Sequence, residues 1–252
     1  MNSTCIHVEN LSCKISGRSI LAIDALHIQQ GERIAIVGHN GAGKSTFLKL
    51  LTGFMPASSG KLNVLNRHLE NNLTTRQLRL LRKEIGQILQ GLHLVSRLSA
   101  LDNVLIGSLG RIAGWQSLLG NYPEIEIELA HQAIQAVGLQ HLTYTRVDKL
   151  SGGERQRIAI ARMLMQQPNL ILADEPTAAL DPGAAIEIGN LLVKSAQNAT
   201  LITVVHNTAL LPNLADRVLG FKSGKIVFDL PVVDVDDERL NQLYENEKTA
   251  IA

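Results

Sequence analysis

Residues 38–46 read GHNGAGKST and follow the apolar run RIAIV at 33–37. They fit the pattern G-x-x-x-x-G-K-[ST] between a predicted strand and a predicted helix, which is the context in which this pattern binds phosphate. Its glycines let successive backbone N–H groups point at phosphate oxygens, and the helix N-terminus adds a positive dipole. We therefore predict a phosphate cradle. Its residues are Gly38, His39, Asn40, Gly41, Ala42, Gly43, Lys44, Ser45 and Thr46.

Three side chains of the cradle have distinct expected roles. Lys44 would neutralise the β and γ phosphates of a nucleotide, and the Ser45 hydroxyl would ligate Mg²⁺. Thr46 would add a hydroxyl near the α phosphate. The alternative for the segment is a glycine-rich turn without a ligand, which the flanking strand and helix disfavour.

A second chemical feature is the acid pair at the end of NLILADEP, residues 169–176. Carboxylates at the carboxyl end of a parallel strand lie where open α/β sheets bind ligands. Asp174 is expected to hold Mg²⁺, and Glu175 to orient and deprotonate the water that attacks the γ phosphate. The alternative is the solvated start of a loop, which is less favoured once the cradle is present.

The elements that must position these residues alternate along the chain. Residues 33–38, 169–176 and 200–207 are predicted to be buried strands, and STFLKLLTG at 45–53 a helix that ends at Gly53. Strands separated by helical segments predict an α/β fold with a mostly parallel core sheet and helices on both faces.

Two regions depart from this alternation. The first 30 residues contain IHVENLSCKI and ILAIDALHI, which favour an N-terminal antiparallel β edge. Residues 91–160 carry helical rather than strand patterns, so we expect a helical insert between two strands of the core sheet. Within it, apolar residues recur at helical spacing before a stop at Gly138: Ile127, Ala130, Ile134 and Val137.

Composition excludes several classes of protein. The 252 residues carry a net charge of +1 and only 3 % aromatic residues, which argues against a polyanion binder and against base stacking, so no nucleic acid is expected. Cys5 and Cys13 are too few for a disulfide framework and lack metal-ligand spacing. No apolar run approaches 18 residues, and the first residues do not resemble a signal peptide. We expect a cytoplasmic protein that is able to dock on a membrane component.

Taken in order, the motifs over about residues 5–228 resemble those of the ATP-binding cassette (ABC) family, a type of P-loop NTPase. Within that family the chain is similar to the stand-alone ATPase subunits of bacterial importers, and most similar to those for phosphonate. The motifs are GHNGAGKST, Gln90 in IGQILQG, LSGGE at 150–154, LILADEP, AALD at 178–181 and His206 in VVHN. The similarity to phosphonate importers rests on residues 91–111, 149–182 and 224–231.

The resemblance implies a head-to-tail dimer of two copies with ATP and Mg²⁺ between them. Each ATP would lie on one cradle and be covered by the signature segment of the other copy, with Ser151, Gly152 and Gly153 donating to the γ phosphate and Glu154 beside them. Asp181 would link the two sites.

Two further residues receive roles from the resemblance. Gln90 would contact Mg²⁺ and the attacking water, and His206 the γ phosphate. These roles imply an ATPase coupled to transport, a translocase.

The implied organisation is one nucleotide-binding domain over residues 1–240, followed by a tail over 241–252. A helical subdomain over about 91–160 would be inserted in a RecA-like core. The resemblance also implies integral membrane permease subunits, contacted by residues 91–111, and indirectly a periplasmic solute-binding protein. The chain would lie on the cytoplasmic face of the membrane.

Three residues depart from the family pattern. Ile15 stands where an aromatic residue usually stacks on adenine, so it offers apolar contact without a π face. Glu154 replaces a common glutamine, and its charge is unfavourable near phosphate unless it turns toward Arg155 or Arg157. Ala178 lacks a hydroxyl that the family commonly has. None of the three belongs to the water-activating set, so hydrolysis is still expected.

Other functions remain to be weighed. An ABC ATPase for a different solute is the nearest alternative. A chromosome or DNA-repair ATPase would carry long heptad segments or a basic stripe, which this chain lacks. A translation factor with two cassettes would need two cradles, and a nucleotide-binding structural protein would not need Glu175 and His206 together.

Overall fold

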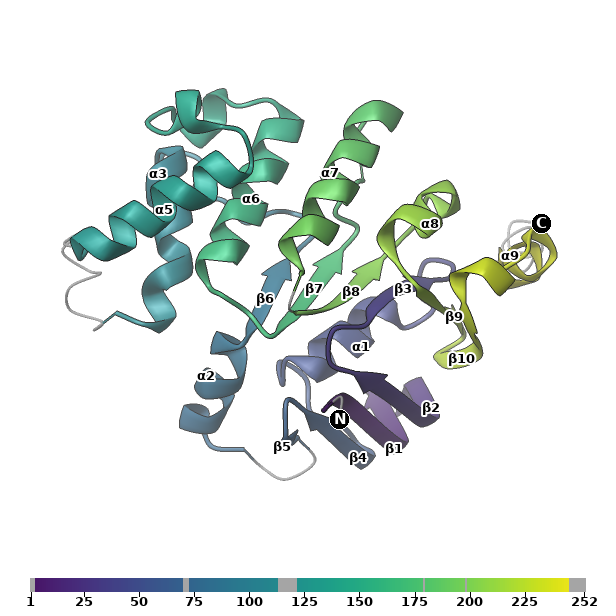
Figure 1. Cartoon of the computed structure of the whole chain (residues 1–252). Helices are drawn as coiled ribbons and strands as arrows, with labels where there is room; N and C mark the ends of the chain where they lie inside the picture. Colours follow the sequence, from purple (N-terminus) through teal and green to yellow (C-terminus); the bar gives the residue numbers. More distant parts are fainter. Residues whose placement is uncertain (1–2, 70–72, 113–121, 179, 198, 245–252) are drawn as a thin grey trace.

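The core of the fold is a six-stranded sheet in the order β10-β9-β3-β8-β7-β6 (Figure 1). The computed structural model describes residues 3–69, 73–112, 122–178, 180–197 and 199–244. Strands β9 to β6 run parallel, and only β10 pairs antiparallel with its neighbour. The mostly parallel core sheet is therefore confirmed. Its strands are β3 (Arg33–Val37), β6 (Ile85–Ile88), β7 (Leu170–Asp174), β8 (Thr200–Val204), β9 (Arg217–Lys222) and β10 (Lys225–Pro231).

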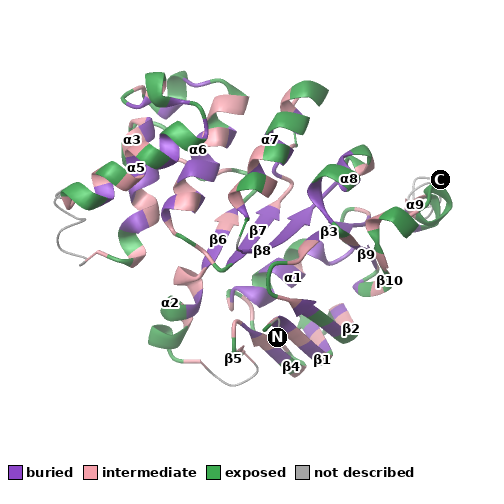
Figure 2. Cartoon of the chain, viewed as in Figure 1, coloured by how far each residue is buried: buried purple, intermediate pink, exposed green. Residues whose placement is uncertain are grey.

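The central strands are apolar along most of their length because elements cover both faces of the sheet. All five residues of β8 are buried, and so are four of the five residues of β3 and of β7. Figure 2 shows these strands in the colour of buried residues, between helices with exposed outer faces. This double burial explains why the sequence of each strand reads as a continuous apolar run.

The N-terminal strands form a sheet of their own. β1 (Thr4–Ile15) and β2 (Arg18–Gln29) pair antiparallel, as the sequence predicts. They do not join the core sheet as an edge, because β1 pairs on its other side with β4 (Ser59–Val64), which pairs with β5 (Arg67–His68).

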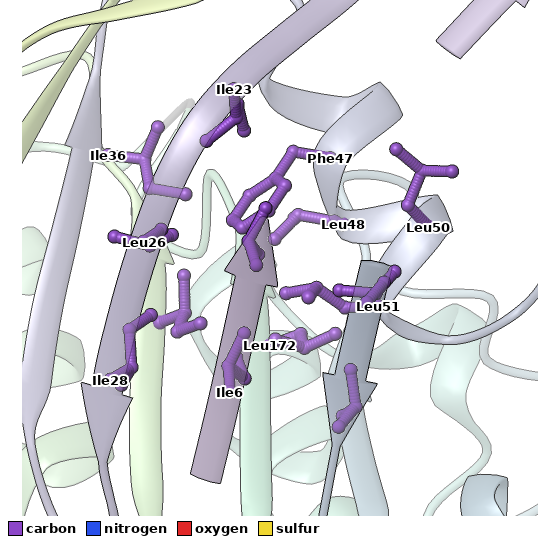
Figure 3. Close-up of a cluster of buried hydrophobic side chains, with 14 of the residues drawn as sticks. Ile6, Ile23, Leu26, Ile28, Ile36, Phe47, Leu48, Leu50, Leu51 and Leu172 are labelled. Carbon is purple, nitrogen blue, oxygen red and sulfur yellow. The ribbon is translucent and has the colours of Figure 1, made fainter. Parts of the chain in front are cut away.

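Helix α1 (Lys44–Leu51) joins the two sheets through its apolar side chains. Phe47, Leu50 and Leu51 are fully buried, and the Phe47 ring lies 5.6 Å from the Phe221 ring of β9. Figure 3 shows Phe47 among side chains of both sheets, including Ile6 and Ile36. The helix that follows the cradle is thereby packed on both sheets.

The helical insert lies between β6 and β7, as predicted, and its apolar side chains form one buried cluster with those of β7 and α7 (Pro182–Ser195). Its longer helices pack against each other, and α6 also contacts β6. Residues 113–121 of the insert lie outside the described residues. The described elements are α3 (Ala100–Leu105), η1 (Ile106–Gly110), α5 (Glu124–Ala136), η2 (Gln140–Leu142), η3 (Val147–Lys149) and α6 (Gly152–Met165).

The remaining helices surround the core sheet. A third apolar cluster joins α8 and the C-terminal helix α9 to the core strands. α9 runs across residue 240, while residues 245–252 of the expected tail lie outside the described part of the chain. None of the helices described has the length and apolar character needed to cross a bilayer. The helices outside the insert, apart from α1, are α2 (Thr75–Lys83), α7 (Pro182–Ser195), η4 (Thr208–Leu210), α8 (Leu211–Leu214), η5 (Val232–Asp234) and α9 (Asp237–Tyr244).

Candidate active site

The predicted cradle connects β3 to α1 and surrounds a cavity of about 300 Å³. Gly38 has φ +149°, and a Cβ there would lie 2.2 Å from the Phe221 carbonyl oxygen, so only glycine fits this close approach. Gly43 caps α1 with φ +102°. The cavity is lined by Ile20, Asn40, Gly41, Ala42, Gly43, Lys44, Ser45, Thr46 and Glu175. Seven of the nine predicted cradle residues therefore share one cavity.

The Lys44 side chain bonds to the loop that it follows. Its ammonium group donates to the carbonyl oxygens of Gly38, at 2.7 Å, and of His39, at 2.9 Å. Lys44 is 5 % exposed, so these bonds compensate the burial of its charge. These bonds tie the Lys44 side chain to Gly38 and His39 at the start of the loop, beside the cavity.

Glu175 lies between the two other predicted catalytic residues, Gln90 and His206. Gln90 Nε2 donates to Glu175 Oε2 at 3.0 Å, and His206 Nε2 lies 2.7 Å from Glu175 Oε1. Gln90 and Glu175 are 85 positions apart in sequence, and Glu175 and His206 are 31 positions apart. The parallel strands β6, β7 and β8 bring the three residues together.

The backbone at Glu175 has an unusual conformation. Its φ is +55°, in the left-handed region that non-glycine residues rarely adopt. Such strain costs about 1–3 kcal/mol and clusters at functional sites. It occurs here directly after β7, where the chain turns the carboxylate toward the cradle cavity.

Asp174 carries the group best suited to a metal ion. Its Oδ1 is buried and has no hydrogen-bond partner among the described residues. Burial raises the pKa of Asp174, and the hydrogen bond from the Ser45 hydroxyl counteracts part of this rise. An unpaired buried carboxylate oxygen beside a serine hydroxyl fits the oxygen ligands that Mg²⁺ prefers, so the residues fit this ion.

The signature segment forms the N-terminus of α6 as a capping box. The Ser151 side chain accepts the Glu154 N–H, and the Glu154 carboxylate accepts the Ser151 N–H at 2.8 Å. This bond from Ser151 lowers the pKa of Glu154. Glu154 thus turns to the backbone of Ser151, and Arg157, one of the two arginines toward which it could turn, pairs with Glu187 at 2.7 Å.

Two glycines of the signature segment have open surroundings. A Cβ at Gly152 or Gly153 would meet no atom within 4 Å. Packing within this chain therefore does not require glycine at either position. Their N–H groups lie in the first turn of α6, where helix geometry supplies no acceptor. An exposed donor edge follows, made of two N–H groups and the Ser151 hydroxyl.

The signature segment does not line the cradle cavity of its own chain. Gly152 lines a different cavity of about 390 Å³, together with Gln90, Arg155, Ala178 and Glu175. Glu175 is the residue common to both cavities. Gly152 thus shares a cavity with Glu175 but does not line the cradle cavity.

The remaining predicted residues lie around this centre. Ile15 ends β1, is 44 % exposed and does not line the cradle cavity, whereas Ile20 does. Asp181 caps α7 by accepting the Ala184 N–H at 3.0 Å. His39 Nδ1 lies 2.6 Å from the Asn40 carbonyl oxygen. Their expected contacts with nucleotide or a second copy remain predictions.

Sequence reasoning missed two features of the site. The capping box has a sequence signature, S-x-x-E, which Ser151 and Glu154 satisfy. Ile20 carries no such signal, because it enters the site through the pairing of β1 and β2 and the approach of β2 to Gly43.

A further cavity of about 500 Å³ separates α2 from α6 and η1. Among the described residues, its lining includes four cationic residues and no carboxylate: Arg79, Arg82, Lys83 and Arg162. Arg82 also donates to the carbonyl oxygens of Thr52 and Gly53.

Comparisons with known proteins agree on one family. The family described as ABC transporter matches residues 21–178. The chain is 40 % identical over 223 residues to "Phosphonates import ATP-binding protein PhnC 3" of Halalkalibacterium halodurans, covering 87 % of this chain and 85 % of the relative. It is also 40 % identical over 245 residues to "Phosphonates import ATP-binding protein PhnC 2" of Pseudomonas syringae, covering 95 % and 88 %.

Solved structures share the fold. One is cbiO1 from Clostridium perfringens, part of an ABC transporter complex, with a TM-score of 0.80 and 29 % identity over 96 % of this chain and 99 % of that one. Another is a dimeric ATP-binding cassette in a post-hydrolysis state bound to ADP and Pi, with a TM-score of 0.74 and 27 % identity over 90 % and 98 %.

Proposed function

The chain belongs to the ABC transporter family, and on that premise we propose that it is the ATP-hydrolysing subunit of a bacterial importer for phosphonate or a related phosphorus oxyanion. One structural observation carries the catalytic part of the proposal. Glu175 lines the cradle cavity and is held at both carboxylate oxygens, by Gln90 and by His206. The nature of the solute is supported by the relatives that are 40 % identical and named for phosphonate import.

The proposed nucleotide site uses the cradle and the end of β7. ATP would lie with its phosphates over the N-terminus of α1, where backbone N–H groups and the helix dipole favour negative charge. Lys44 would bind the β and γ phosphates, and Thr46 the α phosphate. Ile15 and Ile20 would give the adenine apolar contact. Mg²⁺, held by Ser45, Asp174 and Gln90, would neutralise the charge that develops between the β and γ phosphates.

The proposed hydrolysis step is an in-line attack of water on the γ phosphorus. Glu175 accepts a proton from the water as the new P–O bond forms, and the bond to the β–γ bridging oxygen breaks. Gln90 and His206 hold the carboxylate in place, and His206 also contacts the γ phosphate. The products are ADP and phosphate.

A second copy of the chain would complete each site. A Cβ at Gly152 or Gly153 would meet open space, and their segment does not line the cradle of its own chain. In a head-to-tail dimer, Ser151 and these glycines would donate to the γ phosphate held by the other copy. Loss of that phosphate on hydrolysis removes the bridge, and the dimer opens.

The membrane partners would bind next to the helical insert. The 500 Å³ cavity is lined by Ile106, Gly107 and Gly110, which lie in the segment expected to contact the permease. The same cavity touches Gln87 of β6, three residues before Gln90. A permease segment docked there would therefore sense movement of the Gln90 loop. The chain would lie on the inner face of the cell membrane, and a periplasmic binding protein would deliver the solute.

We also propose that residues 1–240 form a single nucleotide-binding domain. Its helical subdomain would span about residues 91–160. This domain contains one cradle, one acid pair and one signature segment. In the dimer, its cradle and acid pair would belong to one ATP site and its signature segment to the other.

The test is uptake of radiolabelled methylphosphonate by cells in which the chromosomal copy of this gene is deleted. Uptake should be lost on deletion, restored by the wild-type gene and not restored by Glu175→Gln. Uptake of inorganic phosphate through other systems serves as the control. Undiminished methylphosphonate uptake in the deletion strain would count against phosphonate as the solute.

ATP hydrolysis by the purified protein tests the enzymatic part separately. A wild-type protein that binds and hydrolyses ATP while the deletion strain still takes up methylphosphonate would point to a different solute. A protein that binds no ATP would overturn the assignment of the cradle.

A further inference from the structure

The first residue of the cradle is bonded to the last described helix of the chain. The Gly38 N–H donates to the Tyr244 hydroxyl oxygen at 3.3 Å, although 206 positions separate the two residues. Gly38 is buried, and a buried backbone N–H without an acceptor is costly. The pairing of β3 with β9 ends at Val37, so these strands supply no acceptor for the Gly38 N–H. The Tyr244 hydroxyl supplies that acceptor.

The other side of Gly38 is bonded to Lys44. The Gly38 carbonyl oxygen accepts from the Lys44 ammonium group at 2.7 Å. Gly38 is also confined sterically, because even a Cβ atom would overlap the Phe221 carbonyl oxygen. One glycine therefore connects the Tyr244 hydroxyl to the cation that is expected to hold phosphate.

Helix α9 is fixed at both ends, so the position of Tyr244 is determined by the fold. At its N-terminus, the Arg239 N–H donates to Asp236 Oδ1 at 2.8 Å. At its C-terminus, the Lys222 ammonium group of β9 donates to the Gln242 carbonyl oxygen at 2.6 Å, which also suits the negative end of the helix dipole. Figure 1 shows α9 in yellow beside β9 and β10.

The apolar side of α9 lies in the same apolar cluster as the strand that leads into the cradle. Leu243 is 2 % exposed and belongs to the same cluster as Ala35 and Val37 of β3. Tyr244 itself is half-buried against this cluster. The helix therefore lies near the end of β3, and its last residue is bonded to the position just beyond that strand.

We propose that Tyr244 is a positioning residue for nucleotide binding, which fixes Gly38 and, through it, the Lys44 ammonium group. The inference rests on the proposed function in that the cradle is taken to bind ATP. Its consequence is that α9, which lies at the boundary between the expected domain and the expected tail, is part of the nucleotide site.

The experiment compares Tyr244→Phe with Tyr144→Phe in the full-length chain. Phenylalanine keeps the ring and removes only the hydroxyl. Tyr144 is a matched control because it is 75 % exposed and packs on His131 of the helical insert, away from the cradle. ATP affinity is measured by calorimetric titration with Mg²⁺ in the Glu175→Gln background, so that ATP is not consumed. Hydrogen exchange at the Gly38 amide is measured without nucleotide.

Tyr244→Phe should weaken ATP binding about 3- to 10-fold, the range expected from one hydrogen bond, and speed exchange at the Gly38 amide. In the background that retains Glu175, KM should rise while kcat at saturating ATP changes little, since the lost bond acts on binding. Lys222→Met, which frees the end of α9 without touching the cradle, should change ATP affinity in the same direction. Tyr144→Phe should change none of these.

Two results would overturn the proposal. Unchanged ATP affinity in Tyr244→Phe together with a lower melting temperature would mean that the tyrosine only stabilises the fold. Equal loss of affinity in both tyrosine variants would mean that the effect does not pass through Gly38. Failure of the wild-type chain to bind ATP is a separate outcome, which would overturn the proposed function as well.

Discussion

His206 and Glu175 meet at 2.7 Å where the neighbouring parallel strands β8 and β7 end. The last residues of these strands, Val204 and Asp174, are partners in the sheet register, so the two side chains that follow arise side by side. Gln90 approaches the same carboxylate from the end of β6. Three consecutive strands of one sheet thus supply the candidate base and both residues that hold it.

The first prediction concerns Glu175→Gln. The amide keeps the size of the side chain but offers one acceptor oxygen in place of two, and it cannot accept a proton from water. Turnover should fall by at least about 100-fold, the lower end of general-base contributions, while ATP still binds. The measurement is steady-state phosphate release beside ATP titration.

Glu187→Gln is the matched control for this variant, because Glu187 is 67 % exposed in its side chain and pairs with Arg157 on the surface. It should leave turnover nearly unchanged. Near-normal hydrolysis by Glu175→Gln would remove Glu175 from the role of base.

The second prediction concerns Asp174→Asn, which should raise the stability of the protein and lower its rate of hydrolysis. Burial raises the pKa of Asp174, so the ionised form is disfavoured in the fold. The wild-type protein therefore loses stability as pH rises from the ordinary carboxyl range through the raised pKa, and the variant does not. Without nucleotide, Asp174→Asn should melt at a higher temperature than wild type at pH 8, and the difference should shrink as pH falls through the raised pKa.

Hydrolysis by Asp174→Asn should fall by at least about 100-fold, because a metal ion contributes several kcal/mol of charge stabilisation. Asp24→Asn, an exposed change on β2, should alter neither quantity. A less stable Asp174→Asn protein at pH 8 would contradict the account of burial.

The third prediction concerns Glu154, the acid next to the donor edge. Glu154→Gln keeps an oxygen that accepts the Ser151 N–H, so the capping box survives, but the charge near the expected phosphate is gone. ATP should therefore drive dimerisation at lower concentration, measured by size exclusion in the Glu175→Gln background. Glu154→Ala loses the acceptor and should lower the free energy of unfolding by about 0.5–1.5 kcal/mol, the net contribution of one hydrogen bond.

The pH dependence provides a check on this residue. The bond from Ser151 lowers the pKa of Glu154, so the stabilisation is present above the ordinary glutamate pKa and is lost as pH falls through the lowered value. Glu154→Gln should not show this loss in acid. Identical acid melting curves for both proteins would argue against the capping role of the carboxylate.

The fourth prediction concerns Ile15, which ends β1 and is 44 % exposed. Ile15→Tyr should tighten ATP binding about 3- to 10-fold, because an aromatic ring adds about 0.5–1.5 kcal/mol of stacking beyond its area. Ile125→Tyr, an exposed change on α5, is the control. Equal affinities for wild type and Ile15→Tyr would show that Ile15 does not contact adenine.

Much of the fold could be predicted because its signals are local. The buried strands β3, β7 and β8 read as apolar runs, and α5 ends just before Gly138, which has φ +76°. The grouping of strands was harder. β1 and β2 have the alternation of an antiparallel pair, but their assignment to a sheet with β4 depends on which distant strand each one meets.

The chemistry of the site follows from short segments whose residue types and spacing carry the meaning: the cradle from Gly38 to Thr46, the acid pair, and His206. Only tertiary structure decided how these groups act on one another. It joined Gln90 and His206 to one carboxylate and brought Tyr244 to Gly38 across 206 positions. A motif depends on neighbours along the chain, whereas a hydrogen bond between distant residues depends on the packing of sheets and helices that lie between them.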